Sequence, residues 1–311
     1  MTQRFYSNGK LLLTGEYAVL DGALSFALPT KYGQTLTIKE LDTPVLLWTS
    51  LDEKGEIWFQ TSLQLELLRN VDMKGELANL IASADKVTSL LLNILLEAKK
   101  LNPEFLIKKT GVEVHTELGF PRDWGLGSSS TLINNIAQWA KVNPYELLAK
   151  TFKGSGYDIA CAQHNRPILY QIEGMDTFIK EIEYNPPFTD SLFFVHLNRK
   201  QNSREGINRY KGQVFNKESL VFKISAITEE CINCTDFIRF KELMNTHELL
   251  LSKILKLTPI KEDLFPDFEG SIKSLGAWGG DFVLALGDKN TTAYFNHKGY
   301  RTVIPYRQMI L

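Results

Sequence analysis

The chain has 311 residues, enough for one large domain or two of ordinary size. Hydrophobic residues make up 44% and charged residues 23%, the proportions of a soluble globular protein. A formal net charge of −1 provides no overall basic field, so we expect neither nucleic acid nor a membrane as a partner. No apolar run reaches roughly 18 residues, and Met1–Tyr6 lacks the apolar core of a signal peptide, which predicts a cytoplasmic protein.

Three cysteines, Cys161, Cys231 and Cys234, are too few and too unevenly spaced for a disulfide framework. Cys231 and Cys234 have the spacing of a metal-binding knuckle, but no second Cys/His pair follows at a useful distance. The histidines are scattered, and His247 lies on an apolar-periodic helix, which favours a packed or capping role. We therefore expect free thiols and no zinc site.

The first half of the chain mixes strands and helices. Residues 85–100 carry apolar side chains at the helical period, which predicts a buried helix. A second helix is predicted from Ser128 to about Val142, where Asn143–Pro144 ends it, and a third begins near Tyr145. Strands are predicted at 10–14, 34–38, 45–48 and 111–115, with turns at Gly9, Gly15, Gly22 and Gly33.

The second half predicts strands at 168–172, 192–197 and 282–286, and helices near 216–232, 236–255 and 263–275. Strands first, then clustered helices, then further strands indicate an α+β chain in two lobes. Pro186–Pro187 marks the predicted junction, which gives domains at 1–186 and 187–311. Residues 200–204 come after a predicted strand and contain two cationic side chains, Lys200 and Arg204. This segment is either a solvated loop or a site for a substrate anion.

A glycine-rich turn runs directly into a row of hydroxyls at residues 121–131, Pro-Arg-Asp-Trp-Gly-Leu-Gly-Ser-Ser-Ser-Thr. Glycines let a backbone approach a ligand closely, and the start of the following helix offers N–H groups and a positive dipole end. The turn is therefore a candidate anion site. The alternative is a plain helix cap, because serine caps helices well. No complete dinucleotide-binding or Walker-type glycine motif is present.

Two further segments accompany this turn, Ser-Asn-Gly-Lys-Leu-Leu-Leu-Thr-Gly-Glu-Tyr-Ala-Val-Leu-Asp-Gly at 7–22 and Leu-Gly-Ala-Trp-Gly-Gly-Asp at 275–281. Together the three resemble the signature motifs of the GHMP kinases, the superfamily of galactokinase, homoserine kinase, mevalonate kinase and phosphomevalonate kinase. Residues 154–162, Gly-Ser-Gly-Tyr-Asp-Ile-Ala-Cys-Ala, look like the stretch that supplies the catalytic aspartate in mevalonate-pathway kinases. We call 7–22 motif 1, 125–131 the glycine–serine loop and 275–281 motif 3.

The resemblance implies a two-lobed fold, with an N-terminal half like ribosomal protein S5 domain 2 and a ferredoxin-like C-terminal half. It implies a monomeric or homodimeric phosphotransferase that uses ATP and Mg²⁺ on a small hydroxy-acid or phosphate substrate. Phosphomevalonate and mevalonate, intermediates of isoprenoid biosynthesis, are the expected acceptors. The wording around Glu16 and Asp158 is closer to phosphomevalonate kinases, whereas the chain length is nearer mevalonate kinase. Alternatives are a homoserine or sugar kinase and a catalytically degenerate, nucleotide-binding homologue.

The resemblance also assigns roles to residues. Asp158 would orient or deprotonate the acceptor, and Lys10 would keep that carboxylate ionised or stabilise the transferred phosphoryl group. Ser129 would bind the Mg²⁺ ion in addition to the phosphates. The ATP phosphates would be held by Gly125, Leu126, Gly127, Ser128, Ser129, Ser130 and Thr131. The expected acceptor-binding residues are Glu16, Tyr17, Gly156, Gly276, Ala277, Gly279 and Gly280.

Three positions depart from the family pattern, and the change at Asn8 is minor because it affects only local stiffness. Trp278 stands where motif 3 normally has glycine, and Asn8 replaces the usual proline before Gly-Lys. Leu147 and Leu148 occupy the region where mevalonate kinases place a magnesium-binding glutamate. Trp278 and the missing glutamate support the degenerate alternative. The presence of both Asp158 and Lys10 argues against it.

Overall fold

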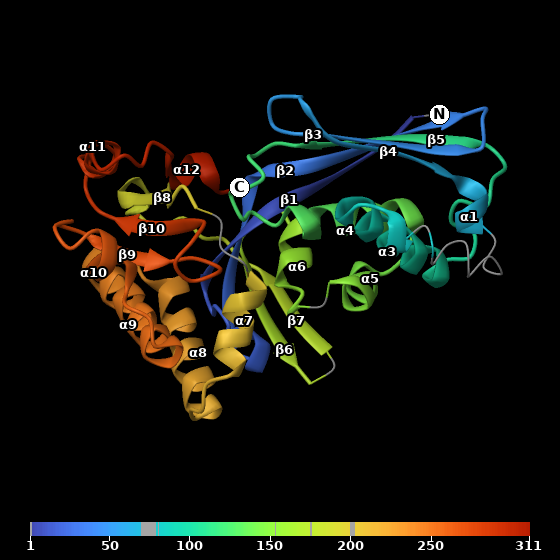
Figure 1. Ribbon diagram of the computed structural model, residues 1–311. Helices are drawn as coiled ribbons and strands as arrows, with labels where there is room; N and C mark the ends of the chain where they lie inside the picture. Colours follow the sequence, from blue (N-terminus) through green and yellow to red (C-terminus); the bar gives the residue numbers. More distant parts are fainter. Residues whose placement is uncertain (1, 70–78, 80, 153, 175, 200–202) are drawn as a thin grey trace. The chain divides into compact units, whose positions relative to one another are not determined.

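The structure is a computed structural model that describes residues 2–69, 79, 81–152, 154–174, 176–199 and 203–311 (Figure 1). The chain forms two compact units, and it passes between them more than once. Unit 1 comprises the described residues of Met1–Gly9, Tyr32–Arg122 and Gly127–Gln163, and unit 2 those of Lys10–Lys31, Asp123–Leu126 and His164–Leu311.

Unit 1 contains a mixed sheet. Strand β3 (Val45–Leu51) pairs antiparallel with β4 (Ile57–Gln64) and parallel with β5 (Gly111–Leu118). Residues 34–41 of the long strand β2 (Ser25–Leu41) pair antiparallel with β5. Strand β1 (Thr2–Thr14) pairs with β2, and both strands continue into unit 2.

Helices gather on one face of this sheet (Figure 1). Asp85 caps the first turn of α3 by accepting from the N–H groups of Val87 and Thr88, and Asn143 caps α5 in the same way. Their apolar sides pack on sheet residues that include Leu46 and Trp48, forming one buried core. The helices of this unit include α1 (Leu65–Arg69), α3 (Lys86–Leu101), α4 (Ser128–Ala140), α5 (Pro144–Thr151) and α6 (Tyr157–Gln163).

In unit 2, residues 25–27 of β2 pair with β6 (Ile168–Glu173), which pairs with β7 (Asp176–Glu181). A second, antiparallel sheet has the order β11-β8-β10-β9. Its strands are β8 (Leu192–His196), β9 (Ser271–Ser274), β10 (Phe282–Leu286) and β11 (Val303–Pro305).

Helices flank this second sheet as well. Helices α9 (Phe237–Leu255) and α10 (Ile260–Leu264) contact β9, whereas α11 (Thr291–His297) and α12 (Tyr306–Met309) contact β8 (Figure 1). Short 3₁₀ helices span Ala18–Asp21 (η1) and Thr189–Ser191 (η2). The α-helices of the unit are α7 (Ser203–Lys211), α8 (Lys217–Asn233), α9 (Phe237–Leu255), α10 (Ile260–Leu264), α11 (Thr291–His297) and α12 (Tyr306–Met309).

The predicted α+β class is confirmed, and most predicted elements are present. The helix expected at 263–275 is wrong, because α10 ends at Leu264 and β9 occupies residues 271–274. Pro266 disfavours helical backbone at the residue before it, which explains the break. All the residues of β9 are buried, so its sequence lacks the alternation that reveals a half-exposed strand. The junction at 186/187 stays a prediction.

Two of the predicted glycine turns are also wrong. Gly9 lies within β1 and Gly33 within β2. A Cβ on Gly33 would overlap the carbonyl oxygen of Ser7 and the hydroxyl of Tyr6, so the glycine permits a close approach of two strands instead of a turn. Gly15, by contrast, directly precedes a turn, with φ 100°, and Gly22 lies in a turn, with φ 92°.

Two sequence-based expectations concern membranes and thiols. Among the described residues, no helix combines the length and apolar character needed to cross a membrane. All three cysteines are free thiols, with Cys161 and Cys231 buried and Cys234 partly exposed.

Candidate active site

The turn of motif 1 begins where β1 ends at Thr14. A Cβ on Gly15 would overlap the side chain of Ser25, and its φ of 100° also requires glycine. Tyr17 has a φ of 60°, an uncommon backbone conformation for a bulky residue. Ala18 donates its N–H to the carbonyl oxygen of Glu16 at 2.7 Å, which tightens the turn into η1. The segment is thus a strained turn whose shape the neighbouring structure enforces.

Tyr17 connects this turn with motif 3. Its hydroxyl accepts a hydrogen bond from the backbone N–H of Trp278 at 3.0 Å. Its ring stacks on Tyr210 of α7, with 5.5 Å between centroids. Burial raises the pKa of the Tyr17 phenol, so the hydroxyl stays protonated at neutral pH. A residue expected to bind the acceptor therefore also holds the two motifs together.

Trp278 fits motif 3 without the freedom of a glycine. The left-handed positions in and beside this turn are Gly276, Gly279 and Asp281, with φ of 65°, 84° and 50°. The indole is only 5% exposed and fills a hydrophobic cluster. The cluster's other buried members are Tyr17, Ala18, Ala23, Tyr210, Leu220, Ile224, Leu251 and Leu255. Trp278 thus fixes the turn by packing in this cluster, while Gly276 and Gly279 adopt the positive φ angles that the turn requires.

The first part of the glycine–serine loop lies in unit 2, beside the other two motifs. The backbone N–H of Lys10 donates to the carbonyl oxygen of Leu126 at 3.0 Å. Gly125 has a φ of 65°, and a Cβ there would overlap the carboxylate of Asp281. Trp124 packs edge-to-face on Phe282 of β10, at 5.4 Å between centroids. Three segments that are far apart in sequence therefore meet within one unit.

The second part of the loop lies in unit 1, where it starts helix α4. Gly127, with a φ of 88°, is the N-cap residue, and no side chain caps the helix. Ser128, Ser129 and Ser130 are inside the first turn, so the plain serine cap considered from the sequence is not what the chain forms. A helix start with no capping side chain keeps its N–H groups available for an anion.

A buried polar network fixes the first turns of α4, and sequence reasoning missed it. Thr131 donates its hydroxyl to the Gln34 side chain at 2.7 Å, and Asn135 donates to the Gln34 carbonyl at 2.9 Å. Ser7 donates to Asn135 at 2.7 Å and accepts from Asn134 at 2.9 Å. Buried polar groups satisfied in this way set the position of the helix end within unit 1.

Asp158 and Gly156 also lie in unit 1. Gly156 has a φ of 90°, and its carbonyl oxygen accepts from the N–H groups of Ile159 and Ala160 at the start of α6. Asp158 is half-buried in the first turn of α6, and α6 packs against α4. Leu147 and Leu148 are buried in the core of unit 1, so the place of the family's magnesium glutamate is hydrophobic here.

Other sequence-based candidates are less informative. Lys200, Gln201 and Asn202 lie outside the described residues, while Ser203 and Arg204 begin α7. In the described part of the chain, no three His, Cys, Asp or Glu side chains gather closely enough to hold a metal ion. A magnesium ion bound mainly by nucleotide phosphates and water does not need such a cluster.

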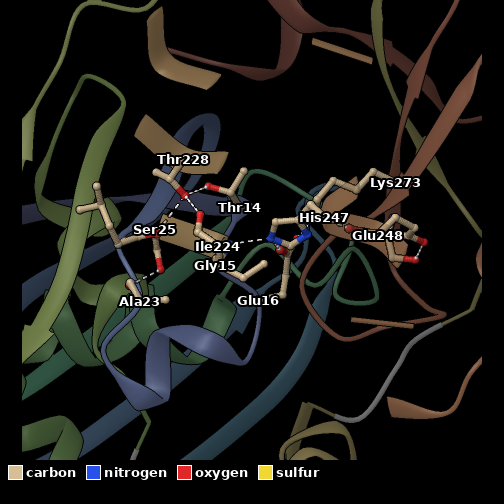
Figure 2. Close-up of polar contacts among 12 residues, drawn as sticks. Thr14, Gly15, Glu16, Ala23, Ser25, Ile224, Thr228, His247, Glu248 and Lys273 are labelled. Carbon is tan, nitrogen blue, oxygen red and sulfur yellow. Dashed lines mark hydrogen bonds and ion pairs between the residues drawn. The ribbon is translucent and has the colours of Figure 1, made fainter. Parts of the chain in front are cut away.

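A buried cluster of charged residues lies next to the motif 1 turn (Figure 2). It consists of Glu16, Lys273 of β9, and His247 and Glu248 of α9, all at most 3% exposed. Lys273 donates through Nζ to Glu16 Oε1, and His247 Nε2 accepts the N–H of Gly15 at 3.0 Å. The packed role predicted for His247 is confirmed, whereas nothing in the sequence singled out Lys273.

Burial dominates the electrostatics of this cluster. It raises the pKa of Glu16 to about 7, against the opposing effect of the Lys273 ammonium. It also raises the pKa of Glu248. Burial and the nearby Lys273 hold the pKa of His247 well below its ordinary value, so this imidazole is neutral. Glu16 is therefore a carboxylate whose charge state changes near physiological pH.

The chain is similar to known proteins in its three-dimensional structure. No protein-family model matches the sequence, and no curated protein is a significant match. A mevalonate kinase crystal structure is 18% identical, with a TM-score of 0.69, over 97% of this chain and 96% of that one. Streptococcus pneumoniae phosphomevalonate kinase, in complex with phosphomevalonate and AMPPNP, is 17% identical over 95% of both chains, with a TM-score of 0.64.

The similar solved structures also include a sugar kinase. Lactococcus lactis galactokinase, complexed with galactose, is 14% identical over 98% of this chain and 94% of that chain, with a TM-score of 0.68. All three proteins are kinases of the superfamily that the sequence motifs resemble, and each likeness spans nearly the whole chain. The chain therefore has the fold of the GHMP kinases.

Proposed function

We propose that the protein is an ATP-dependent small-molecule kinase whose acceptor is phosphomevalonate or mevalonate. The observation that carries this proposal is the meeting of motif 1, the first part of the glycine–serine loop and motif 3 within unit 2. Motif 1 is joined to the loop by the hydrogen bond from the Lys10 N–H to the Leu126 carbonyl oxygen, and to motif 3 by the bond from the Trp278 N–H to the Tyr17 hydroxyl. The loop lies against motif 3 at Gly125, where any Cβ would overlap Asp281. The uncapped start of α4 and the GHMP kinase fold support the same function.

In this proposal the protein contributes positioning and electrostatics, as phosphoryl transfer requires. The N–H groups at the start of α4, with Gly125 and Gly127 before them, hold the ATP phosphates. Lys10, whose backbone is bonded to Leu126, stabilises the charge of the transferred group. Ser129 and Asp158, together with the nucleotide phosphates, would hold Mg²⁺, which would supply neutralisation of the phosphate charge there.

The role of Asp158 depends on the acceptor. A mevalonate hydroxyl loses a proton during the transfer, and the carboxylate of Asp158 would accept it. The phosphate of phosphomevalonate is already ionised, so Asp158 would orient it and Lys10 would contribute more of the rate. The wording of the sequence around Glu16 and Asp158 favours phosphomevalonate.

The direct test is a coupled assay of ADP release with mevalonate, phosphomevalonate, homoserine and galactose. Phosphomevalonate or mevalonate should give the highest kcat/KM. Asp158→Ala and Lys10→Met should each lower kcat by about 100-fold or more. The exposed Lys54 in the β3–β4 turn supplies a control, Lys54→Met, which should keep wild-type kinetics. Near-normal kcat in both site variants would refute the assigned roles.

A second candidate function is nucleotide binding without catalysis. The observation that favours it is the burial of Leu147 and Leu148 where mevalonate kinases place a magnesium-binding glutamate. Measurable ATP binding together with no ADP release on any of the four acceptors would favour this function over the kinase.

A further inference from the structure

Four ionisable side chains are enclosed together in unit 2, contributed by three separate segments (Figure 2). Glu16 comes from the motif 1 turn, His247 and Glu248 from α9, and Lys273 from β9. Charged groups are rarely buried this fully unless partners hold them in place. The cluster holds two carboxylates but one ammonium group, so it contains an excess negative charge whenever both carboxylates are ionised.

The hydrogen bonds divide the two carboxylates between different partners. Glu248 accepts from the N–H and from the hydroxyl of Ser274, both at 2.9 Å. Lys273 donates to Glu16 and to the carbonyl oxygen of Ser274, the latter at 2.8 Å. Strand β9 thus satisfies Glu248 through Ser274, while its lysine is directed at Glu16.

His247 does not provide Glu16 with a second hydrogen bond. Its Nε2 atom accepts the N–H of Gly15, and the same atom lies 3.2 Å from Glu16 Oε2. Because the imidazole is neutral, an atom that accepts a hydrogen bond carries no proton to donate. When Glu16 is ionised, two acceptors therefore face each other, and the ammonium group of Lys273 is the partner that holds the carboxylate.

The location of Lys273 connects this pair with the segments expected to bind the acceptor. Strand β9 ends at Ser274 and leads directly into motif 3, where the N–H of Trp278 bonds to Tyr17. Glu16 is the residue before Tyr17 in the strained turn. The ion pair and the Tyr17–Trp278 hydrogen bond thus join the same two segments at neighbouring points.

We propose that Lys273 is a positioning residue for the acceptor, acting by holding the Glu16 carboxylate ionised and oriented within the motif 1 turn. The inference rests on the proposed kinase function, in which this turn contacts the acceptor. Lys273 itself is buried and does not touch the substrate. Its loss should weaken acceptor binding and leave ATP binding intact.

The charges around Glu16 give this proposal a pH signature. Lys273 lowers the pKa of Glu16 and Glu248 raises it, while His247 is neutral. Cys231 faces Lys273 from α8, and burial raises its thiol pKa, so it carries no charge there. Lys273→Met should therefore raise the pKa of Glu16, and Glu248→Gln should lower it. The two variants are matched, because each removes one buried charge from the same cluster.

The experiment measures kcat and acceptor KM against pH, and the ATP dissociation constant by calorimetry. The acceptor is mevalonate or phosphomevalonate, whichever the wild type phosphorylates. Lys273→Met should raise acceptor KM about tenfold or more and change the ATP constant less than about twofold. Lys273→Arg should restore most of the affinity. The fall of kcat/KM on the acidic side should move to higher pH in Lys273→Met and to lower pH in Glu248→Gln.

A double variant keeps the test valid if Lys273→Met does not fold. Replacing both members of this buried pair leaves neither of the two unpaired, and Glu248 keeps its hydrogen bonds from Ser274, so Glu16→Gln/Lys273→Met should fold. Its acceptor KM should equal that of Glu16→Gln alone, because Lys273 acts through Glu16. An unchanged acceptor KM in Lys273→Met, or independent effects in the double variant, would overturn the inference. A wild type that phosphorylates no acceptor would instead overturn the proposed kinase function itself.

Discussion

Tyr17 and Trp278 are 261 positions apart, and the hydroxyl of the tyrosine accepts the backbone N–H of the tryptophan at 3.0 Å. The contact joins a turn with a strained residue to a turn built on positive-φ glycines. A buried N–H that loses its acceptor costs about 1–3 kcal/mol. The bond thus contributes to stability and also determines where motif 3 lies.

Removing this hydroxyl is the first prediction. Tyr17→Phe should lower the free energy of unfolding by about 1–3 kcal/mol, because the Trp278 N–H is left without its acceptor. Urea denaturation measures the change. The control is Phe215→Leu, because Phe215 packs on Tyr210 in the same region. This variant loses aromatic packing but keeps the Tyr17–Trp278 hydrogen bond. A stability of Tyr17→Phe equal to that of the wild type would show that the bond contributes nothing.

Gly206 in α7 provides a second prediction. A Cβ there would overlap the Tyr17 hydroxyl, whereas at Gly212 the nearest atom would be the Asn208 carbonyl oxygen at 3.3 Å. Gly206→Ala should destabilise the protein by about 1–3 kcal/mol despite alanine's better helix propensity. Gly212→Ala should cost clearly less. Thermal unfolding of the two variants compares them, and equal losses would contradict the close packing.

Gly125 of the glycine–serine loop and Gly276 of motif 3 provide a third prediction, because both have the same φ. Gly125 and Gly276 both have a φ of 65°, but a Cβ at Gly125 would overlap Asp281, whereas one at Gly276 would meet open space. Both alanine variants incur the backbone cost of about 1–2 kcal/mol. Gly125→Ala should lose more stability than Gly276→Ala in urea denaturation. A larger loss at Gly276 would contradict the arrangement.

The fourth prediction concerns pH. The folded-state pKa of Glu16, about 7, is raised above its ordinary value of 4.5. Its contribution to stability is therefore fully present below pH 4.5 and is lost as the pH rises through 7. Over that window the wild type should lose up to about 3 kcal/mol relative to Glu16→Gln.

Urea denaturation of the wild type and of Glu16→Gln at pH 5 and pH 8 measures this difference. Subtracting the two proteins at each pH removes the titration of the groups that are not coupled to Glu16. A stability difference that is independent of pH would show that Glu16 does not titrate in this window.

The parts of the site that were predictable from sequence are those set by local backbone chemistry. Glycines that permit a turn or a close approach, such as Gly15 and Gly125, stand out because few other residues fit there. Helix α4 was predictable from its apolar period. Lys273 was not, because a lysine in a four-residue strand looks like a surface residue until its partner 257 positions away is known.

The same limit applies to Trp278 and to the asparagines of α4. From the sequence, Trp278 is a departure from a glycine motif, and only the packing of α7, α8 and α9 residues around it shows where the indole fits. Asn134 and Asn135 look like exposed helix positions, yet both are buried. Long-range partners decide these positions, and a single sequence does not contain that information.

The distribution of thiols has a practical consequence. Cys161 and Cys231 are buried, and Cys234, which follows the end of α8, is partly exposed. Because alkylation requires access to the thiolate, a maleimide dye should attach at Cys234 while the protein is folded. The native chain therefore offers one natural attachment point for fluorescence studies of ligand binding, without engineered cysteines.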